Sequence, residues 1–350
     1  MTTTRDVASL AGVSVATVSA VINGNKFVSP DLVCRVEKAI AALGYRPNLV
    51  ARSLKSGRTR TLGVLIPNIR DPYWAEIVAS IEDVARAEGY RIFLCDTEEN
   101  PDTEEKSLRI LAEMKVDGIA IVPTGNQSEQ RVAPLLEAGI GVVAVARKLQ
   151  GLDLDSVVSD NEMAGYLGTH HLLSLGYRRV GILAFPTYAS AGRDRLSGYQ
   201  RALAEAGIPV DPLLIQHGGA PLEERGYRAA EQLLKTPGVR PDAVVVCNHL
   251  MMLGLLKCLR EQGVRVPEDV GLVGFDEYPW TPFMEPPLTV VQQLRSETGI
   301  ATAKRLIARV RGEFRGPGEE ISMPISLIVR KSCGSLLTTP AGDRAEISPR

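Results

Sequence analysis

The chain has 350 residues, 45% of them hydrophobic, which excludes a disordered protein and allows two or three domains with sizeable cores. The formal net charge of −1 hides an asymmetry, because residues 1–60 hold nine Lys or Arg against three acidic residues, while the remainder is acidic. A small basic head on a mildly acidic body indicates that the head binds a polyanion.

The first 46 residues predict three short helices. Gly12 offers a turn after the first helix, and Ser14 is a good N-cap for a second helix that reaches about Ile22. Ser29 is the expected cap of a third helix, with Pro30 in its first turn and Gly44 as its stop. This order is typical of a helix-turn-helix DNA-binding domain, although a generic helical bundle with a basic surface fits the helices alone.

The stretch "GVSVATVSAVING" at residues 12–24 carries no charge, so we also weighed an export leader. A leader needs a positive start and a compact apolar run. Here Asp6 cancels Arg5, and the run contains several hydroxyl and amide side chains. The sequence therefore favours a mature helical domain over a leader.

Residues 47–60 are a basic connector. Asn48 can cap a helix of about eight residues that ends near Ser56, and such a short helix is marginal alone in water. Its positive charges predict that it becomes ordered on phosphate backbones. Leu54 either packs on the neighbouring domain or enters a minor groove as a wedge that kinks DNA.

The body, residues 61–332, alternates short apolar runs with amphipathic stretches such as 73–88 and 195–206, which predicts parallel sheets covered by helices. The expected strands span residues 62–66, 91–95, 118–122, 141–145, 179–184, 243–247 and 270–275. Glycine-rich phosphate loops and Gly-x-Ser-x-Gly are absent from the sequence, so we predict a binding protein and not an enzyme.

Ligands of open α/β sheets bind where parallel strands end. Polar and aromatic residues follow four of the expected strands: Asn68, Asp71, Tyr73, Trp74; Tyr188, Ser190, Arg193, Arg195; Asn248, His249; Asp276 and Trp280. This set lacks an obvious nucleophile and base, and it suits a small polar ligand held by hydrogen bonds and stacking.

Cysteine and histidine usage predicts neither disulfides nor a metal site. The five cysteines are scattered, and His170 and His171 are adjacent, so on a helix they point in different directions. A reducing compartment fits this pattern, and we expect no cofactor and no membrane span.

The chain resembles the lactose-repressor (LacI/GalR) family of bacterial transcriptional regulators. The resemblance is collinear over residues 3 to about 332 and is carried by "RDVASLAGVSVATVSAVING", "VSPDLVCRVEKAIAALGYRPNLVARSL", "TLGVLIPNIRDPYWAEIV", "GRDRLSGYQRAL" and "VPEDVGLVGFDE". It implies a small all-α helix-turn-helix head (1–46), a hinge helix (47–60) and a periplasmic-binding-protein-like α/β body of two similar lobes with parallel sheets (61–332). Lobe 1 would hold about 61–160 plus 292–322, and lobe 2 about 161–291 plus 323–332. We expect a disordered tail at 333–350.

The resemblance also implies functional residues. A homodimer would bind a near-palindromic operator, with Val15, Ala16 and Ala20 facing base edges and Ser14, Thr17, Ser19 and Asn23 holding the backbone. The hinge would enter the minor groove with Asn48, Ala51, Arg52, Leu54 and Lys55. For a small-molecule effector, commonly a sugar, the resemblance implies contacts with Trp74, Arg195 and Asp276. The strand-end positions add Tyr73, Asn248 and His249 to the predicted effector site. Alternatively, Arg195 and Asp276 form an ion pair within one lobe, and Trp74 belongs to the core or a dimer interface.

Several positions depart from the family's pattern. Many members have Asn-Asp where this chain has Asn248-His249, and an acidic residue where it has Ala146. No aromatic residue lies near Pro221, and Ala20 replaces a frequent long polar side chain. A sugar is the family's commonest effector and stays the expected one, although these departures weaken the match to a set of ring hydroxyls. His249 would instead suit a ligand with an anionic group and would respond to pH.

The leading hypothesis is an effector-responsive repressor in the cytoplasm, associated with the nucleoid. The main alternative is an exported solute-binding protein with the same two-lobed body. A sugar-processing enzyme is disfavoured, because the sequence shows no recognisable nucleophile, metal set or phosphate loop.

Overall fold

The computed structural model describes residues 2–23, 26–45, 58–125, 127–219, 222–236 and 238–335. The chain divides into two compact units, the head (1–60) and the body (61–350), and each is described by itself. The predicted hinge residues from Asn48 to Lys55 lie outside the described residues.

The head consists of α1 (Thr4–Ala11), α2 (Val15–Asn23) and α3 (Pro30–Leu43). Val7, Val18 and Val36, one from each helix, are fully buried against one another in a small core. Gly12 and Gly44 end α1 and α3 in the left-handed conformation, as predicted, because glycine adopts it without steric cost.

The cap of α3 differs from the prediction. Ser29 lies at the N-cap position, but its side chain makes no capping hydrogen bond. The helix start is instead defined by Pro30, whose fixed φ suits the first helical position, and by Asp31 near the positive end of the helix dipole.

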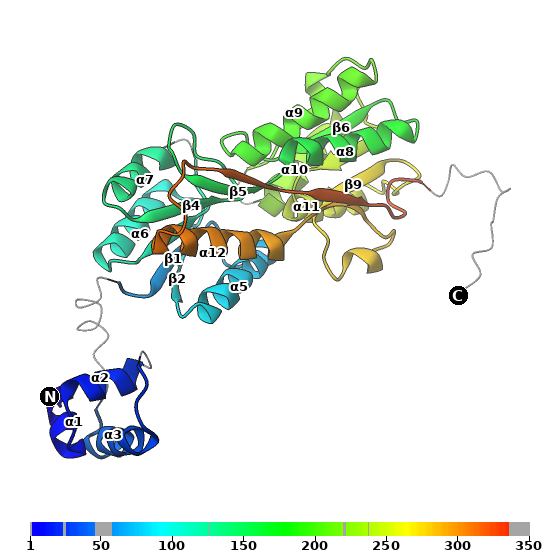
Figure 1. Ribbon diagram of the computed structural model, residues 1–350. Coiled ribbons are helices and arrows are strands. Elements are labelled where there is room, and N and C mark those ends of the chain that lie inside the picture. The colour runs from blue at the N-terminus through cyan, green and yellow to red at the C-terminus, as the bar shows by residue number, and fades with distance from the viewer. Residues whose placement is uncertain are drawn as a thin grey trace, which may run out of the picture. The chain divides into compact units, whose positions relative to one another are not determined.

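Lobe 1 of the body is built on a six-stranded, fully parallel sheet in the order β11-β5-β4-β3-β1-β2. Its strands are β1 (Thr61–Ile66), β2 (Arg91–Asp96), β3 (Gly118–Ile121), β4 (Gly141–Val145), β5 (Asp155–Ser159) and β11 (Glu320–Met323). Helices α5 (Pro72–Ala87) and α12 (Arg295–Arg311) cover one face, and α6 (Pro101–Glu113) and α7 (Ser128–Glu137) cover the other (Figure 1).

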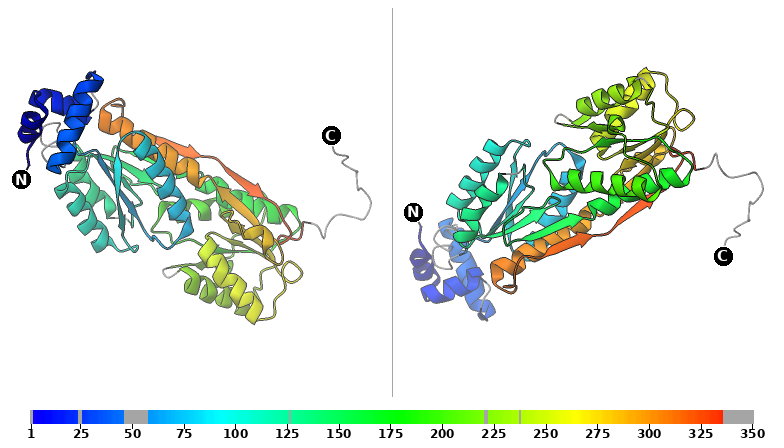
Figure 2. Two further views of the ribbon diagram at one scale, coloured as in Figure 1. Left: turned by 90° about the horizontal axis from the view of Figure 1, so that it is seen from below. Right: turned by 90° about the horizontal axis from the view of Figure 1, so that it is seen from above.

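Lobe 2 repeats this plan with the order β12-β10-β9-β8-β6-β7. Its strands are β6 (Val180–Ala184), β7 (Ile215–His217), β8 (Ala243–Val246), β9 (Gly271–Phe275), β10 (Thr289–Gln293) and β12 (Ile325–Ile328). Its helices are α8 (Asn161–Ser174), α9 (Ser190–Glu205), α10 (Leu222–Lys235) and α11 (His249–Glu261), and short 3-10 turns occur at Pro212–Leu214 and Thr281–Phe283. The pairs α8–α9 and α10–α11 lie on opposite faces of the sheet (Figure 2).

Glycines allow the paired helices of lobe 2 to approach closely. A Cβ atom on Gly165 of α8 would overlap the backbone carbonyl of Arg195 in α9, and one on Gly198 would overlap that of Glu162. Gly226 and Gly254 play the same part between α10 and α11. Since Arg195 lies at the α8–α9 contact, these glycines help to place a predicted site residue.

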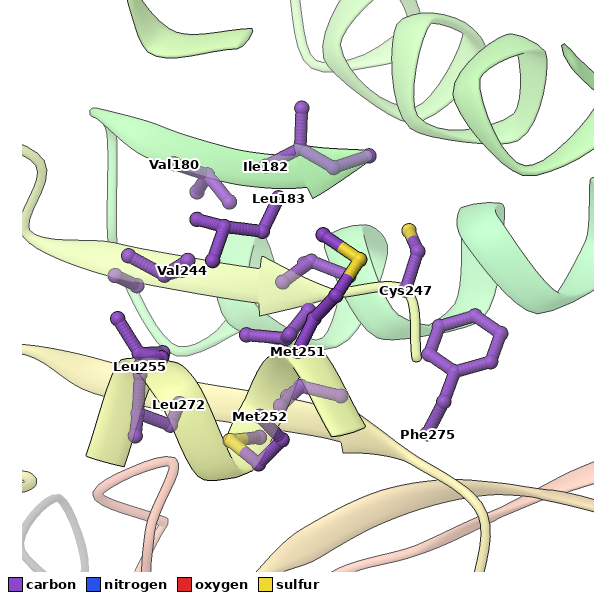
Figure 3. Packing of buried hydrophobic residues seen from close by; sticks show 14 of the residues in the cluster. Val180, Ile182, Leu183, Val244, Cys247, Met251, Met252, Leu255, Leu272 and Phe275 are labelled. Atoms are coloured by element: carbon purple, nitrogen blue, oxygen red, sulfur yellow. The ribbon is translucent and has the colours of Figure 1, made fainter. Parts of the chain in front are cut away.

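The core of lobe 2 packs helix side chains onto the sheet (Figure 3). Met251 and Met252 of α11 are buried against strand residues such as Ile182 and Val244. A near-continuous apolar strand such as β8 is expected in a parallel sheet that helices cover on both faces.

The chain crosses between the lobes at three places: from β5 to α8, from β10 to α12 and from β11 to β12. This explains why both lobes contain residues far apart in the sequence. The predicted parallel sheets are confirmed, but β12 runs antiparallel to β10. Five short strands that we did not predict, β5, β7, β10, β11 and β12, complete the sheets.

Two further predictions need correction. Helix α9 begins at Ser190 and not near Arg195. Cys333, assigned to the tail, is fully buried in the core of lobe 2, where its Sγ lies 3.3 Å from Nε2 of His171. The apolar surface beneath the chain end therefore keeps it on the body as far as residue 335, the last one described.

All five cysteines are free thiols. Within the described parts of the chain, no single helix has both the length and the apolar character needed to cross a membrane.

Candidate effector cleft and DNA-facing head

The start of α2 forms an exposed surface on the head. Helices α1 and α2 meet at 105°, an angle typical of a helix-turn-helix. The hydroxyl of Ser14 accepts a hydrogen bond from the backbone N–H of Thr17 at 3.1 Å, so Ser14 caps α2 as predicted. Arg35 of α3 donates to the carbonyls of Ala11 and Gly12 and thereby holds the turn between the two helices.

Exposure separates the predicted base-reading positions. Val15 is 43% exposed, and Ser14 and Ala16 are also exposed. Ala20 is only 8% exposed, so it offers less surface to a base edge than Val15 and Ala16 do. Thr17 and Ser19 are half-buried.

The body contains a cavity of about 520 Å³ between its lobes, at the carboxyl ends of the parallel strands. Five of the six predicted effector residues line it: Tyr73 and Trp74 from lobe 1, and Arg195, Asn248 and Asp276 from lobe 2. The volume lies within the range of small-molecule sites.

The cavity wall holds strained backbone. Among the described non-glycine residues with positive φ, Glu98, Glu99, Ala146 and Asp276 all line the cavity. Aspartate tolerates this conformation, but alanine and glutamate adopt it at a cost. Such strain concentrates at binding sites, which supports a functional role for this cleft.

A row of hydrogen bonds runs along the floor of the cleft. Arg195 donates to Oε1 of Gln293 at 3.1 Å, and Nε2 of Gln293 donates to Oδ1 of Asp276 at 2.7 Å. Arg195 and Asp276 are thus joined through Gln293, and in the described part of the chain they do not form the direct ion pair that we weighed as an alternative. Sequence reasoning missed Gln293, although its position as a polar residue at the end of a buried strand was the available signal.

Arg195 is buried, yet its partners here are neutral. It donates to Oδ1 of Asn161 at 2.9 Å and to the carbonyl of Cys247 at 2.5 Å, in addition to Gln293. Its guanidinium also lies 4.5 Å from the ring centroid of Phe275. These contacts orient the side chain precisely while leaving its positive charge available to a ligand.

Aromatic side chains form the lobe 1 wall. The rings of Tyr73 and Trp74 meet edge to face at 4.8 Å, and the Tyr73 hydroxyl donates to Gln293 across the lobes at 3.3 Å. Trp74 is 8% exposed and belongs both to the lobe 1 core and to the cavity lining. Burial raises the pKa of Tyr73, which keeps its hydroxyl protonated as a donor.

Arg147 separates this cavity from a second one. Its guanidinium binds the Glu99 carboxylate at 2.5 and 2.9 Å and lies over the ring of Phe185 in lobe 2. Arg147 lines both the first cavity and a second of about 450 Å³, whose lining also includes Lys148, Gln150, Tyr188, Ser190 and Arg193. The cleft therefore extends to Tyr188, Ser190 and Arg193, which also follow the end of an expected strand.

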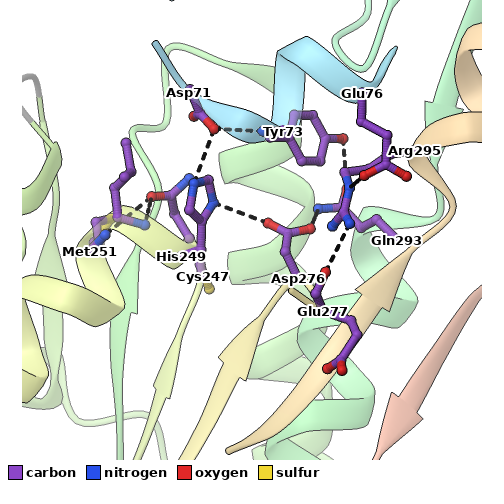
Figure 4. Close-up of polar contacts among 12 residues, drawn as sticks. Asp71, Tyr73, Glu76, Cys247, His249, Met251, Asp276, Glu277, Gln293 and Arg295 are labelled. Carbon is purple, nitrogen blue, oxygen red and sulfur yellow. Dashed lines mark hydrogen bonds and ion pairs between the residues drawn. The ribbon is translucent and has the colours of Figure 1, made fainter. Parts of the chain in front are cut away.

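Asn248 and His249 lie side by side in the sequence but in different surroundings, since Asn248 lines the cavity and His249 does not. The Asn248 side-chain oxygen caps α11 by accepting from the N–H groups of Leu250 and Met251. His249 is 7% exposed and lies behind the cavity lining, facing the carboxylates of Asp71 and Asp276 (Figure 4).

Comparison with known proteins decides the family. Residues 3–48 match the sequence model for bacterial regulatory proteins of the lacI family, and residues 59–331 match that for periplasmic binding proteins and the sugar-binding domain of the LacI family. The chain belongs to the LacI family. The expected family and two-lobed fold are confirmed.

Several relatives are similar over nearly the whole chain. The HTH-type transcriptional repressor PurR of Haemophilus influenzae (strain PittEE) is 34% identical over 96% of this chain and 100% of the relative. Among solved structures, the lac repressor dimer bound to operator and the anti-inducer ONPF has a TM-score of 0.83 and 27% identity, with 95% of this chain and 99% of that chain covered. The complex of the transcriptional regulator CelR with cellobiose has a TM-score of 0.72 and 33% identity, with 95% and 100% covered.

These findings establish the class of activity. This LacI-family chain is a DNA-binding transcriptional repressor whose activity is modulated by a small-molecule effector, and it is not an enzyme. As a DNA-binding repressor it acts in the cytoplasm, and nothing supports the exported solute-binding alternative.

Proposed function

We propose that the effector is a sugar or a related small polar metabolite, held by Tyr73, Trp74, Arg195, Asn248 and Asp276. The observation that carries this proposal is the hydrogen-bonded row from Arg195 through Gln293 to Asp276, which faces Trp74 across one cavity. Sugar hydroxyls both donate and accept, so they match a row that presents guanidinium, amide and carboxylate groups in turn.

The cleft also has space for a second ring. The second cavity meets the first at Arg147 and is lined by polar side chains such as Lys148 and Gln150. CelR, which is similar to this chain, was solved with the disaccharide cellobiose. Both facts favour testing disaccharides beside monosaccharides.

Isothermal titration of the full chain with neutral monosaccharides, disaccharides beginning with cellobiose, and nucleobases would test the effector class. We expect saturable binding of at least one sugar, weakened by roughly 10- to 100-fold in Asp276→Asn, because one or two charged hydrogen bonds are lost. Binding of nucleobases alone would overturn the sugar assignment while keeping the cleft.

For the head, we propose that Val15 and Ala16 contact base edges, while Ser14, Thr17, Ser19 and Asn23 hold the sugar–phosphate backbone. The exposure of Ser14, Val15 and Ala16 supports this assignment. Apolar side chains recognise thymine methyl groups, so we expect A·T pairs at the positions that face them.

For the hinge, we propose that residues 47–60 order on DNA and that Leu54 enters the minor groove beside Asn48, Ala51, Arg52 and Lys55. Sites captured from genomic DNA would supply the operator. Leu54→Ala should then weaken its binding by roughly 10-fold or more without changing the melting temperature, whereas Leu54→Met should retain most of the affinity. Equal operator affinity of Leu54→Ala and the wild type in a gel-shift titration would contradict the insertion of Leu54 into the minor groove.

We further propose a homodimer, nucleoid association and the domain limits 1–46, 47–60 and 61–332. The dimeric lac repressor supports the homodimer, since a two-fold protein matches a two-fold operator. Light scattering of the full chain at micromolar concentration tests it directly.

A further inference from the structure

His249 lies between carboxylates of opposite lobes. Its Nε2 is 3.1 Å from Oδ1 of Asp71, which caps α5 in lobe 1, and its Nδ1 is 3.4 Å from Oδ2 of Asp276, which follows β9 in lobe 2 (Figure 4). Exposure is 7% for His249, 5% for Asp71 and 2% for Asp276. One imidazole ring therefore connects both lobes across the cleft floor, away from water.

This geometry selects one protonation state. A neutral imidazole has a single N–H, so one of the two carboxylates would face a nitrogen lone pair. Only the imidazolium presents a proton to each. Within the described residues, the two contacts at 3.1 and 3.4 Å lack the alignment of hydrogen bonds, so they stabilise mainly through charge, which favours the charged ring.

Electrostatics agree with the geometry. Burial by itself lowers the pKa of His249, but Asp276 and Asp71 outweigh burial and raise it to about 9. Burial likewise raises the pKa of Asp276, yet His249 and the nearby Arg195 and Arg295 bring it below its ordinary value. At neutral pH the ring is then charged and the Asp276 carboxylate is ionised.

The other charged side chains around the cluster of His249, Asp71 and Asp276 bind other partners. The charged and titratable side chains that face it are Arg195 from α9, Arg295 from α12, Tyr73 from α5 and Tyr278, whose ring centroid lies 4.8 Å from that of His249. Arg295 binds Glu76, and Arg195 binds neutral acceptors. Among the described residues, His249 is the only basic side chain within ion-pair distance of Asp71.

We infer that His249 is a positioning residue whose protonated ring forms ion pairs with Asp71 of lobe 1 and Asp276 of lobe 2. The position of one lobe against the other then depends on the protonation of His249. The inference concerns the body alone and holds whichever effector the cleft accepts. These ion pairs also explain why the basic ring of His249 lies between the acidic side chains of Asp71 and Asp276. Without it, two buried carboxylates would face each other across the cleft.

The protonation state can be measured directly. The chain has four histidines, so selectively labelled histidine gives few NMR signals in the full-length protein. We expect one ring, lost in His249→Gln, to titrate near pH 9, and its pKa to fall in Asp71→Asn. A neutral His249 ring at pH 7 would overturn the proposal even if the variants failed to fold.

A double-mutant cycle tests the interaction between His249 of lobe 2 and Asp71 of lobe 1. Asp71→Asn keeps an N-cap side chain and removes only the charge, so it pairs well with His249→Gln. Thermal unfolding at pH 7 should show that the two substitutions together cost less than the sum of each alone. His170→Gln, which changes an exposed ring on α8, is the matched control.

The sign of the pH dependence follows from the raised pKa. The ordinary pKa of histidine is 6.5 and that of His249 is about 9, so the stabilisation is fully present below pH 6.5 and is lost as the pH rises through 9. The non-additivity should therefore vanish at pH 10. Additive effects of His249→Gln and Asp71→Asn on stability at pH 7, or the same non-additivity at pH 10, would contradict the proposed ion pairs.

Discussion

The head and the body handle their functional residues in opposite ways. In the head, a core of a few residues such as Val18 and Val36 holds the helices, and the proposed DNA contacts at Ser14, Val15 and Ala16 are exposed. In the body, large cores lie in each lobe, and the proposed effector contacts, such as Arg195, are buried in the cleft.

The partners explain this difference. DNA is larger than the head and is read from outside, so its contacts can be removed without disturbing the fold. A small effector must be enclosed, so its contacts also belong to the packing and hydrogen bonding of the lobes. Substitutions should therefore separate binding from stability in the head and combine them in the body.

The largest effect is expected for Val18→Asp. A charge placed in the fully buried Val18 position of so small a core should unfold the head and abolish operator binding, while the body melts as in the wild type. Val15→Ala on the same helix should keep the head folded and change only sequence preference. Circular dichroism and gel shift read the two outcomes, and a folded Val18→Asp head would contradict the small-core argument.

Arg195→Ala should affect binding and stability together. It leaves the acceptors of Asn161 and Cys247 without this donor and removes one of the two donors to Gln293 Oε1. We therefore expect a loss of about 3 kcal/mol in the free energy of unfolding of the body, with effector response abolished. Arg195→Lys keeps the charge but not the fork and should recover stability only in part. If chemical denaturation showed wild-type stability for Arg195→Ala, the buried network would be unimportant.

Gly165→Ala tests the position of α9 without touching the cleft. The added Cβ would overlap the Arg195 carbonyl, so the helices must separate at a cost of about 2 kcal/mol, and effector affinity should fall because Arg195 moves. Gly219→Ala, which meets nothing closer than 3.8 Å, is the control. Differential scanning fluorimetry compares the two.

The smallest effect is expected for Glu224→Gln. It removes an exposed ion pair with Arg228 on α10, so the free energy of unfolding should change by less than about 0.5 kcal/mol, with operator and effector binding unchanged. A larger change in a urea titration would mean that exposed ion pairs of the body contribute to its stability as buried contacts do.

Local signals in the sequence were reliable where a few neighbouring residues determine the outcome. The Ser14 cap and the Gly12 turn follow from residues within one helical turn, and both are confirmed. Strands β1 and β4 were predicted for the same reason, from continuous apolar runs. Ser29 lies at the predicted N-cap position, but the missing side-chain hydrogen bond and the burial of Ala20 did not follow from the local pattern.

The order of residues by itself determined the basic head, the alternation of strands and helices, and the polar residues that follow the strands, since each is a property of charge or periodicity along the chain. Only the tertiary structure decided that Gln293 joins Arg195 to Asp276 and that His249 faces Asp71. His249 and Asp71 are far apart in the sequence and come together only because the chain crosses between the lobes. Buried charges are paired in the tertiary structure by residues from distant parts of the chain, and the local sequence pattern does not show which residues will meet.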